Sequence, residues 1–241
     1  MQNSNQYDPY NQQYSQYDQQ YGGYGYAQQN QISAEAYNLI IGGTLLYGFL
    51  INCFMISFCF ESILGLFSEP ILFYLIYFIL VIAGTTMVNK SDKPSISFIG
   101  YNLIVLPLGM IISIVVNTYA MAGYQTTIAA AFGLTAVVTL IMMFLSTMFP
   151  RFFLSIGTTL MVTLLITIVL ELIMFFLGFS LGIIDYVVVL IFCGYIGYDW
   201  ARAQQNAKTV DNAIDAAAEL YVDIINLFLR LLRILARANN N

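Results

Sequence analysis

The sequence contains no histidine, only three cysteines and very few charged residues for its length. Of its 241 residues, 8 are Lys or Arg and 13 are Asp or Glu, so charged residues make up 9% and hydrophobic residues 59%. Soluble globular chains carry about 25% charged residues. A chain this poor in charge has too few polar groups to cover a surface in water, so the composition predicts an integral membrane protein.

The missing residue types exclude several kinds of chemistry. Without histidine the chain has no Ser-His or Cys-His catalytic pair and no His-ligated zinc or haem. Cys53, Cys59 and Cys193 lie in apolar runs without CxxC spacing, which predicts small buried hydrophobic residues rather than disulfides or ligands. We therefore expect no enzymatic activity, no cofactor, no tightly bound metal and no nucleic-acid partner.

The N-terminal segment, residues 1–31, differs in composition from the rest of the chain. It is built of Gln, Tyr, Asn, Ser and Gly, with Asp8 and Asp18 as its only charged residues, and it has no apolar periodicity. Such a segment cannot bury a core, so we predict a disordered tail that is a candidate contact for a protein partner. Residues 32–241 are predicted to form one transmembrane domain.

Long apolar runs follow the tail, each near the length of about 20 residues that crosses a bilayer. Short polar breaks separate the runs, which predicts an all-α bundle of seven spans in a single compact domain. A β-barrel would need alternating strands of about 10 residues, and the sequence has none. The predicted spans are 37–60, 70–89, 95–117, 125–147, 152–176, 181–200 and 211–235.

Lysine and arginine predict the orientation, because they favour the cytoplasmic side of a membrane. With seven spans, the tail and the basic loops share one side, so the N-terminus is predicted to be cytoplasmic, in a bacterial plasma membrane. The C-terminus then lies outside, where Arg230, Arg233 and Arg237 are unfavourable; a re-entrant last segment would remove this conflict. The basic loop residues are Lys90, Lys93, Arg151, Arg202 and Lys208.

The last predicted helix carries a polar stripe among apolar residues. Its polar residues recur at steps of three or four, so all of them lie on one face of an α-helix. Such a helix crosses a membrane only if this face turns toward other helices or water. A helix lying on the membrane surface is the alternative. The stripe consists of Asn212, Asp215, Glu219, Asp223, Asn226, Arg230, Arg233 and Arg237.

Four of the acidic residues in the last three predicted spans are candidates for a functional role. Two antiparallel neighbours joined by a short loop bring Asp199 close to Asp223, and nearby carboxylates in a low dielectric share a proton. This predicts a pH sensor that attracts a hard cation such as calcium when ionised, unless Asp199 is simply solvated. Glu171 either lines a pore or is protonated and bonded to a threonine such as Thr167. Asp185 is expected at the membrane interface.

Tyr198-Asp199 and the run from Glu219 to Arg233 resemble the C-terminal signature of the Bax inhibitor-1 (transmembrane Bax inhibitor motif) family, in its bacterial form. The resemblance implies two three-helix layers around a central C-terminal helix. It also implies a pH-sensitive calcium leak in which Asp199 and Asp223 are hydrogen-bonded as the sensor. A basic residue near the cytoplasmic end of the second span latches the pair in that family, and here the candidates are Lys90 and Lys93.

Two other functions are consistent with these residues. An aspartyl intramembrane protease uses two membrane aspartates, but its later Gly-x-Gly-Asp motif is missing; the nearest string, Gly182–Asp185, precedes Tyr198-Asp199 and lacks the second glycine. The second alternative function is that of a non-conducting partner protein, which regulates a membrane protease or a stress or cell-death response. The expected partners are the lipid bilayer, calcium ions and protons, with a candidate protein partner at the tail.

Overall fold

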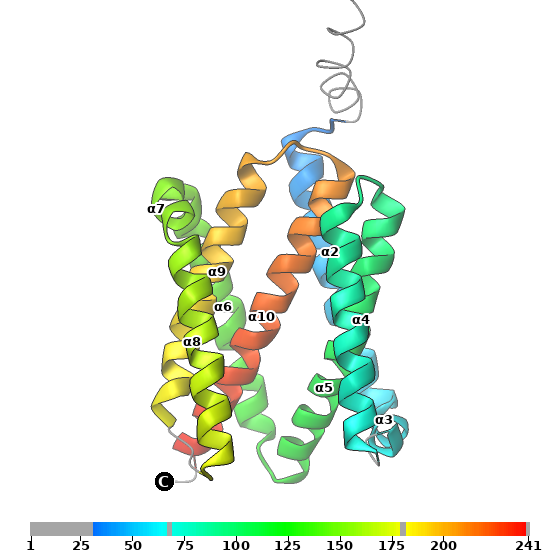
Figure 1. Ribbon diagram of the computed structural model, residues 1–241, viewed down its shortest axis with the longest axis vertical. Helices are drawn as coiled ribbons and strands as arrows, with labels where there is room; N and C mark the ends of the chain where they lie inside the picture. The colour runs from blue at the N-terminus through cyan, green and yellow to red at the C-terminus, as the bar shows by residue number, and fades with distance from the viewer. Residues whose placement is uncertain (1–30, 67–68, 179–181, 240–241) are drawn as a thin grey trace, which may run out of the picture.

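The computed structural model describes residues 31–66, 69–178 and 182–239, and within these ranges it consists of nine α-helices without a β-strand (Figure 1). The predicted all-α class is confirmed, while the predicted tail lies outside the described residues apart from its last residue. The helices are α2 (Ala34–Phe58), α3 (Phe60–Leu66), α4 (Pro70–Lys90), α5 (Pro94–Met121), α6 (Gln125–Met148), α7 (Pro150–Ser155), α8 (Gly157–Phe176), α9 (Gly182–Gln205) and α10 (Val210–Ala238).

Six of the described helices, namely α2, α4, α5, α6, α8 and α9, are long and apolar enough to cross a bilayer. They correspond to the first six predicted spans, so the chain is a multi-pass membrane protein. The fifth prediction, 152–176, is too long, because the short helix α7 ends at Ser155 before α8 begins at Gly157. Likewise the first span ends at Phe58, and α3 follows as a separate helix.

Local sequence signals explain where several helices begin. The side chain of Ser33 accepts a hydrogen bond from a backbone N–H in the first turn of α2, and Thr209 does the same for α10. Pro94 and Pro150 stand in the first turn of α5 and α7, where a missing N–H costs nothing. The predicted polar breaks therefore end and restart helices through ordinary capping chemistry.

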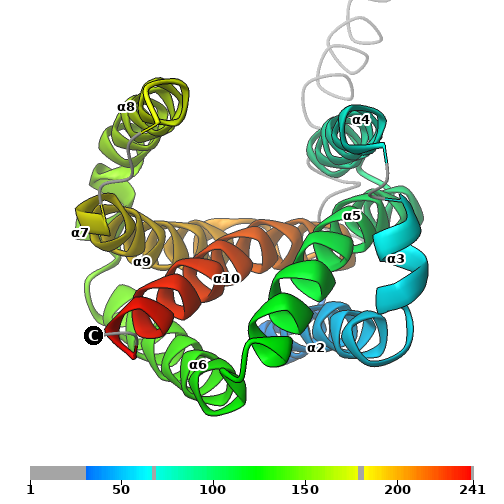
Figure 2. The ribbon, with the colours of Figure 1, turned by 90° about the horizontal axis from the view of Figure 1, so that it is seen from below.

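Helix α10 runs through the middle of the bundle from one end to the other (Figures 1 and 2) and packs against α9, α2, α6 and α5. Its apolar side is fully buried, as at Leu220, Leu227 and Leu232. It is one continuous helix of 29 residues, without the internal break that a re-entrant segment would need. The burial also excludes a helix lying alone on the membrane surface. Its charged residues keep α10 out of the set of six apolar candidates.

The tight packing of α4 on α5 depends on two facing glycines. A Cβ on Gly84 would lie 2.6 Å from the carbonyl oxygen of Gly100, and a Cβ on Gly100 would lie 2.7 Å from that of Gly84. Small residues that let helix backbones approach this closely are a common basis of helix association in membranes. Apart from α5, helix α4 has little contact with the bundle, and α8 packs mainly on α9.

The three cysteines differ from their predicted burial. All are free thiols; Cys53 is exposed, and Cys59 and Cys193 are partly buried. The prediction was wrong because a helix in a bilayer turns apolar side chains outward as well as inward. Low polarity therefore does not identify the core of such a protein.

Candidate functional site

A cleft of about 550 Å³ lies between α4 and α8, the two helices that stand apart at the edge of the bundle in Figure 2. Helices α9 and α10 form its floor. Along α10 the cleft extends from Ala218 to Arg230, which is about 18 Å at a rise of 1.5 Å per residue. Part of the predicted polar stripe thus faces a cavity inside the bundle. These stripe residues are Glu219, Asp223, Asn226 and Arg230.

Asp199 of α9 and Asp223 of α10 lie together on the floor of the cleft. They are only 7% and 6% exposed, and their carboxyl groups lie close enough to interact with each other. Since a carboxylate has no proton to donate, a hydrogen bond between the two groups forms only when one of them is protonated. Asp223 Oδ2 has no fixed donor as a partner in the described part of the chain. Asp199 is therefore not solvated at a span end; α9 continues to Gln205 and buries it.

Arg202 and Glu219 are the charged neighbours of this pair. The Arg202 guanidinium lies 3.4 Å from Asp199 Oδ1, three residues back on α9, and forms a closer ion pair with Glu219 on α10. It also lies over the ring of Tyr198, 5.4 Å from the ring centre. Three carboxyl groups and one guanidinium thus share one region of the cleft, with the guanidinium joining α9 to α10.

The two predicted latch residues lie elsewhere. Lys90 and Lys93 are exposed at the turn between α4 and α5, where they line a separate depression together with Asp92. Neither lysine forms an ion pair with any residue that the structure describes. In this conformation the structure therefore does not bring them to the aspartate pair, and Arg202 is the cation in contact with it. The signal for Arg202 was its spacing of three residues from Asp199, which places both on one face of α9.

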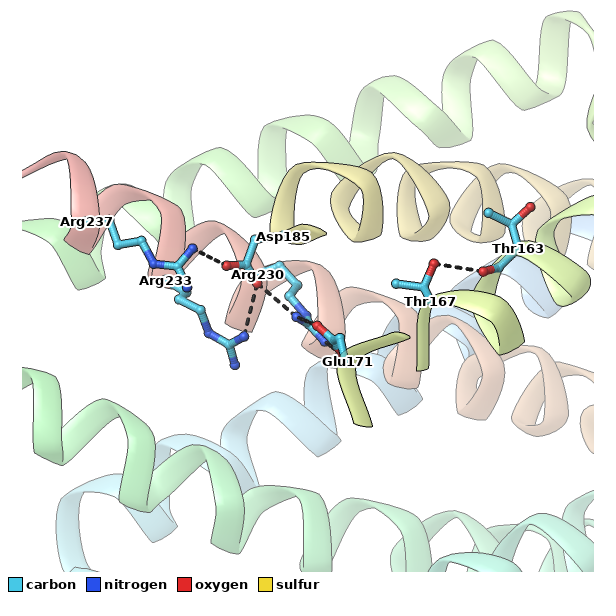
Figure 3. Close-up of polar contacts among 7 residues, drawn as sticks. All are labelled: Thr163, Thr167, Glu171, Asp185, Arg230, Arg233 and Arg237. Atoms are coloured by element: carbon cyan, nitrogen blue, oxygen red, sulfur yellow. Dashed lines mark hydrogen bonds and ion pairs between the residues drawn. The ribbon is translucent and has the colours of Figure 1, made fainter. Parts of the chain in front are cut away.

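A second charged cluster is built around Asp185, at the other end of α10 (Figure 3). Arg230 Nη1 donates to Asp185 Oδ1 at 2.8 Å, Arg233 Nη1 donates to the same oxygen at 3.0 Å, and Arg237 binds Oδ2. Arg230 also holds both carboxylate oxygens of Glu171 from α8. Asp185 is 2% exposed, because three arginines surround its carboxylate; its expected position at the membrane interface stays a prediction.

Glu171 has a different partner from the one predicted. The hydroxyl of Thr167 donates to the carbonyl oxygen of Thr163 at 2.8 Å, whereas Glu171 is paired with Arg230 (Figure 3). The interpretation as a protonated acid bonded to Thr167 is therefore wrong, and Glu171 lies in the wall of the cleft. The three arginines that disfavour an outward C-terminus are thus paired with acids from α8 and α9.

The remaining stripe residues have mainly local partners. Asn226 lines the cleft, but its side-chain amide donates to the carbonyl oxygen of Val222 at 2.8 Å. Asp215 lies outside the cleft lining and is partly buried. Near the start of α10, Ser97 Oγ donates to Asp211 Oδ1 at 2.8 Å, which ties α10 to α5. The predicted stripe is therefore divided mainly between the cleft and the Asp185 cluster, while Asp211, beside the stripe, makes the contact with α5.

Known proteins match this chain over different shares of its length. Residues 29–241 match the family described as "Inhibitor of apoptosis-promoting Bax1". The uncharacterized protein YrjE of Lactococcus lactis subsp. lactis (strain IL1403) is 28% identical over 227 residues, which cover 88% of this chain and 93% of YrjE.

Two plant proteins match over a shorter segment. The BI1-like protein of Arabidopsis thaliana is 43% identical over 61 residues, 25% of this chain and 23% of that protein. Protein LIFEGUARD 3 of the same plant is 50% identical over 56 residues, 23% of this chain and 22% of that protein. The matched segments thus span less than a quarter of either plant protein. Because the family match covers nearly the whole chain, as does the similarity to a bacterial protein, this protein belongs to the Bax inhibitor-1 family.

Proposed function

We propose that this protein is a pH-sensitive, calcium-permeable leak channel gated by Asp199 and Asp223. The observation that carries the proposal is that two buried carboxyl groups meet on the floor of a cleft, a placement that favours a shared proton. With no histidine in the chain, buried carboxyl groups are the side chains available to respond to pH near neutrality.

In this proposal α10 is a seventh span, enclosed by two layers of the other helices. The basic connections between α4 and α5 and between α9 and α10, together with α7, lie at the same end of the bundle as the start of α2 (Figure 1). By the preference of basic residues for the cytoplasm, that end and the N-terminus are cytoplasmic. Its similarity to YrjE over most of the chain favours the plasma membrane of a bacterium.

The proton decides whether α9 and α10 attract or repel each other at the pair. With one proton, the hydrogen bond holds the two helices together and the pair carries a single negative charge. Without it, two negative charges at about 4 Å repel by about 4 kcal/mol at an effective dielectric constant of about 20. Glu219 adds a third negative charge and Arg202 offsets one of them. Loss of the proton therefore loosens the floor of the cleft and attracts a hard cation such as calcium.

Arg202 takes the role of the latch. Its guanidinium contacts Asp199 on its own helix and Glu219 on α10, so it supports the same helix contact as the shared proton. A guanidinium is always charged and binds two carboxylates with fixed geometry, which a lysine does not do.

Calcium flux in proteoliposomes tests the mechanism, measured from about pH 5 to about pH 9 for the wild type and Asp223→Asn. We expect the wild-type leak to rise with pH, and we expect the variant, in which Asp199 has lost the aspartate that shares its proton, to show a flat profile. Asp92→Asn is the matched control, since Asp92 is exposed and outside the cleft. A variant profile with the wild-type pH dependence would sink the proposal.

A non-conducting role as a partner protein is the second candidate, favoured by the Gln- and Tyr-rich composition of residues 1–31. Deleting these residues separates the two functions. Intact flux with a lost cellular phenotype would support interaction through the tail, and reduced flux would assign the tail to the channel.

We do not propose a proteolytic function. The Asp185 carboxylate, the last residue of the string nearest to a protease motif, is held by Arg230, Arg233 and Arg237 instead of facing Asp199. Cleavage of a membrane substrate that is blocked by a transition-state analogue would contradict this.

A further inference from the structure

The arginines around Asp185 have more hydrogen-bonding capacity than their partners use. We propose that Arg233 and Arg237, positioned by Asp185, form a binding site for a phosphate group, most favourably that of an anionic phospholipid. The proposal does not depend on ion conduction, because it concerns the C-terminal part of α10 and not the aspartate pair.

The donors of this site are free to receive a ligand. The side chains of Arg233 and Arg237 are 45% and 44% exposed, whereas that of Asp185 is 3% exposed. Each of the two arginines gives Asp185 a single nitrogen, and neither has another acceptor among the residues that the structure describes. A guanidinium presents five N–H groups in a planar fork that matches two phosphate oxygens. Asp185 holds one corner of each fork, so the outer N–H groups are oriented before a ligand arrives.

The local charge favours an anion. Arg230, Arg233 and Arg237 face Asp185 and Glu171, which leaves one positive charge in excess. Arg230 is largely used by the two acids, and its side chain is only 17% exposed. The excess charge therefore lies at Arg233 and Arg237, where an incoming anion finds it. A single phosphodiester charge would neutralise the cluster.

The cavity in front of the arginines has one polar and one apolar wall. It has a volume of about 500 Å³ and is lined by the arginines on one side and by α8 on the other. Its apolar wall includes Leu172 and Phe175, which are 54% and 74% exposed. A phospholipid would place its phosphate on the guanidinium groups and its acyl chains along this face of α8. Free phosphate uses the same donors but leaves the apolar wall uncovered, which favours the lipid.

The proposal is tested on the purified full-length chain in detergent by native mass spectrometry. The lipid probes are dioleoyl-phosphatidylglycerol and the zwitterionic dioleoyl-phosphatidylcholine, and inorganic phosphate is added as a competitor. We expect the wild type to prefer the anionic lipid. An arginine near an anionic lipid is worth about fivefold in affinity, so R233Q/R237Q is expected to bind it about 30-fold more weakly. Arg151→Gln is the matched control, because Arg151 is an exposed arginine of α7, remote from this cavity.

If inorganic phosphate displaces the lipid, the site accepts a phosphate group from a lipid or from solution. If it does not, the acyl chains contribute to binding. Both results support the site. Equal binding of the two lipids by the wild type, or unchanged binding in R233Q/R237Q, would overturn it. If R233Q/R237Q does not fold, the same lipid-binding measurement on R233K/R237K tests the proposal. Lysines preserve the charges that face Asp185 but lack the fork, so a several-fold loss is expected. Unchanged binding in the lysine variant would overturn the proposal equally.

Discussion

Replacing Asp185 by asparagine tests whether the arginine cluster holds the C-terminal part of α10 in place. The substitution preserves the size of the side chain but removes the one charge that all three arginines share. It also puts an amide N–H₂ group, which is a donor, next to guanidinium donors. Removing one partner of a buried ion pair costs about 3 to 5 kcal/mol, mainly because the other charge is left buried without compensation.

The structure places the expected cost at the lower end of that range. Arg233 and Arg237 are almost half exposed, so solvent takes over part of their loss, and Arg230 keeps Glu171 as a partner. We therefore expect a loss of about 3 kcal/mol in the free energy of unfolding. For a chain of this size this corresponds to a fall of about 6 to 12 °C in Tm.

Thermal unfolding in detergent, followed by circular dichroism, measures the effect. Asp92→Asn is a control of the same chemistry at an exposed site, where a change of less than about 0.5 kcal/mol is expected. A double-mutant cycle with Arg230→Gln should give a coupling energy of about 1 to 3 kcal/mol, because the two residues are in direct contact. A Tm of Asp185→Asn within about 2 °C of the wild type would refute the reasoning, since it would mean that the three arginines do not need this partner.

Two further predictions concern the cleft and its wall. Arg202→Gln removes the ion pair with Glu219 that joins α9 to α10, so calcium leak at acidic pH should rise several-fold over the wild type. The control Lys93→Gln should leave the leak unchanged. Equal leak from both variants would speak against Arg202 as the latch. Gly84→Val forces a side chain against the carbonyl oxygen of Gly100, so we expect a loss of about 1 to 3 kcal/mol in unfolding free energy. A variant with the wild-type Tm would show that α4 moves away from α5 without cost.

Much of the bundle could be predicted because its signals are local. Apolar runs of membrane-spanning length identified six helices, and the polar breaks coincide with capping residues such as Ser33 and Thr209. The steps of three and four residues in the last segment predicted one face of a continuous helix, and that helix is α10. A local pattern is sufficient here, because every backbone polar group in a bilayer must find its partner within the same helix.

The partners of the buried charges could not be predicted in the same way. Asp185 and Glu171 looked like an interfacial and an isolated acid, because the arginines that bind them come from α10, 45 or more residues later in the chain. For Arg202 the separation is short: the family resemblance directed the latch to lysines after the second span, whereas the cation that contacts Asp199 lies one turn away on the same helix.

The sequence by itself determined that this chain is a multi-pass helical membrane protein of the Bax inhibitor-1 family, with two aspartates set 24 residues apart on consecutive helices. Composition and periodicity are sufficient for the helical membrane class, since the bilayer selects for apolar length and the helix repeat sorts residues onto faces. The family followed from the motifs around Asp199 and Asp223, which resemble its C-terminal signature. Only the tertiary structure decided which charges meet. Five helices line the cleft that holds Asp199 and Asp223, and a buried carboxylate can select its arginine only after α8, α9 and α10 have packed together.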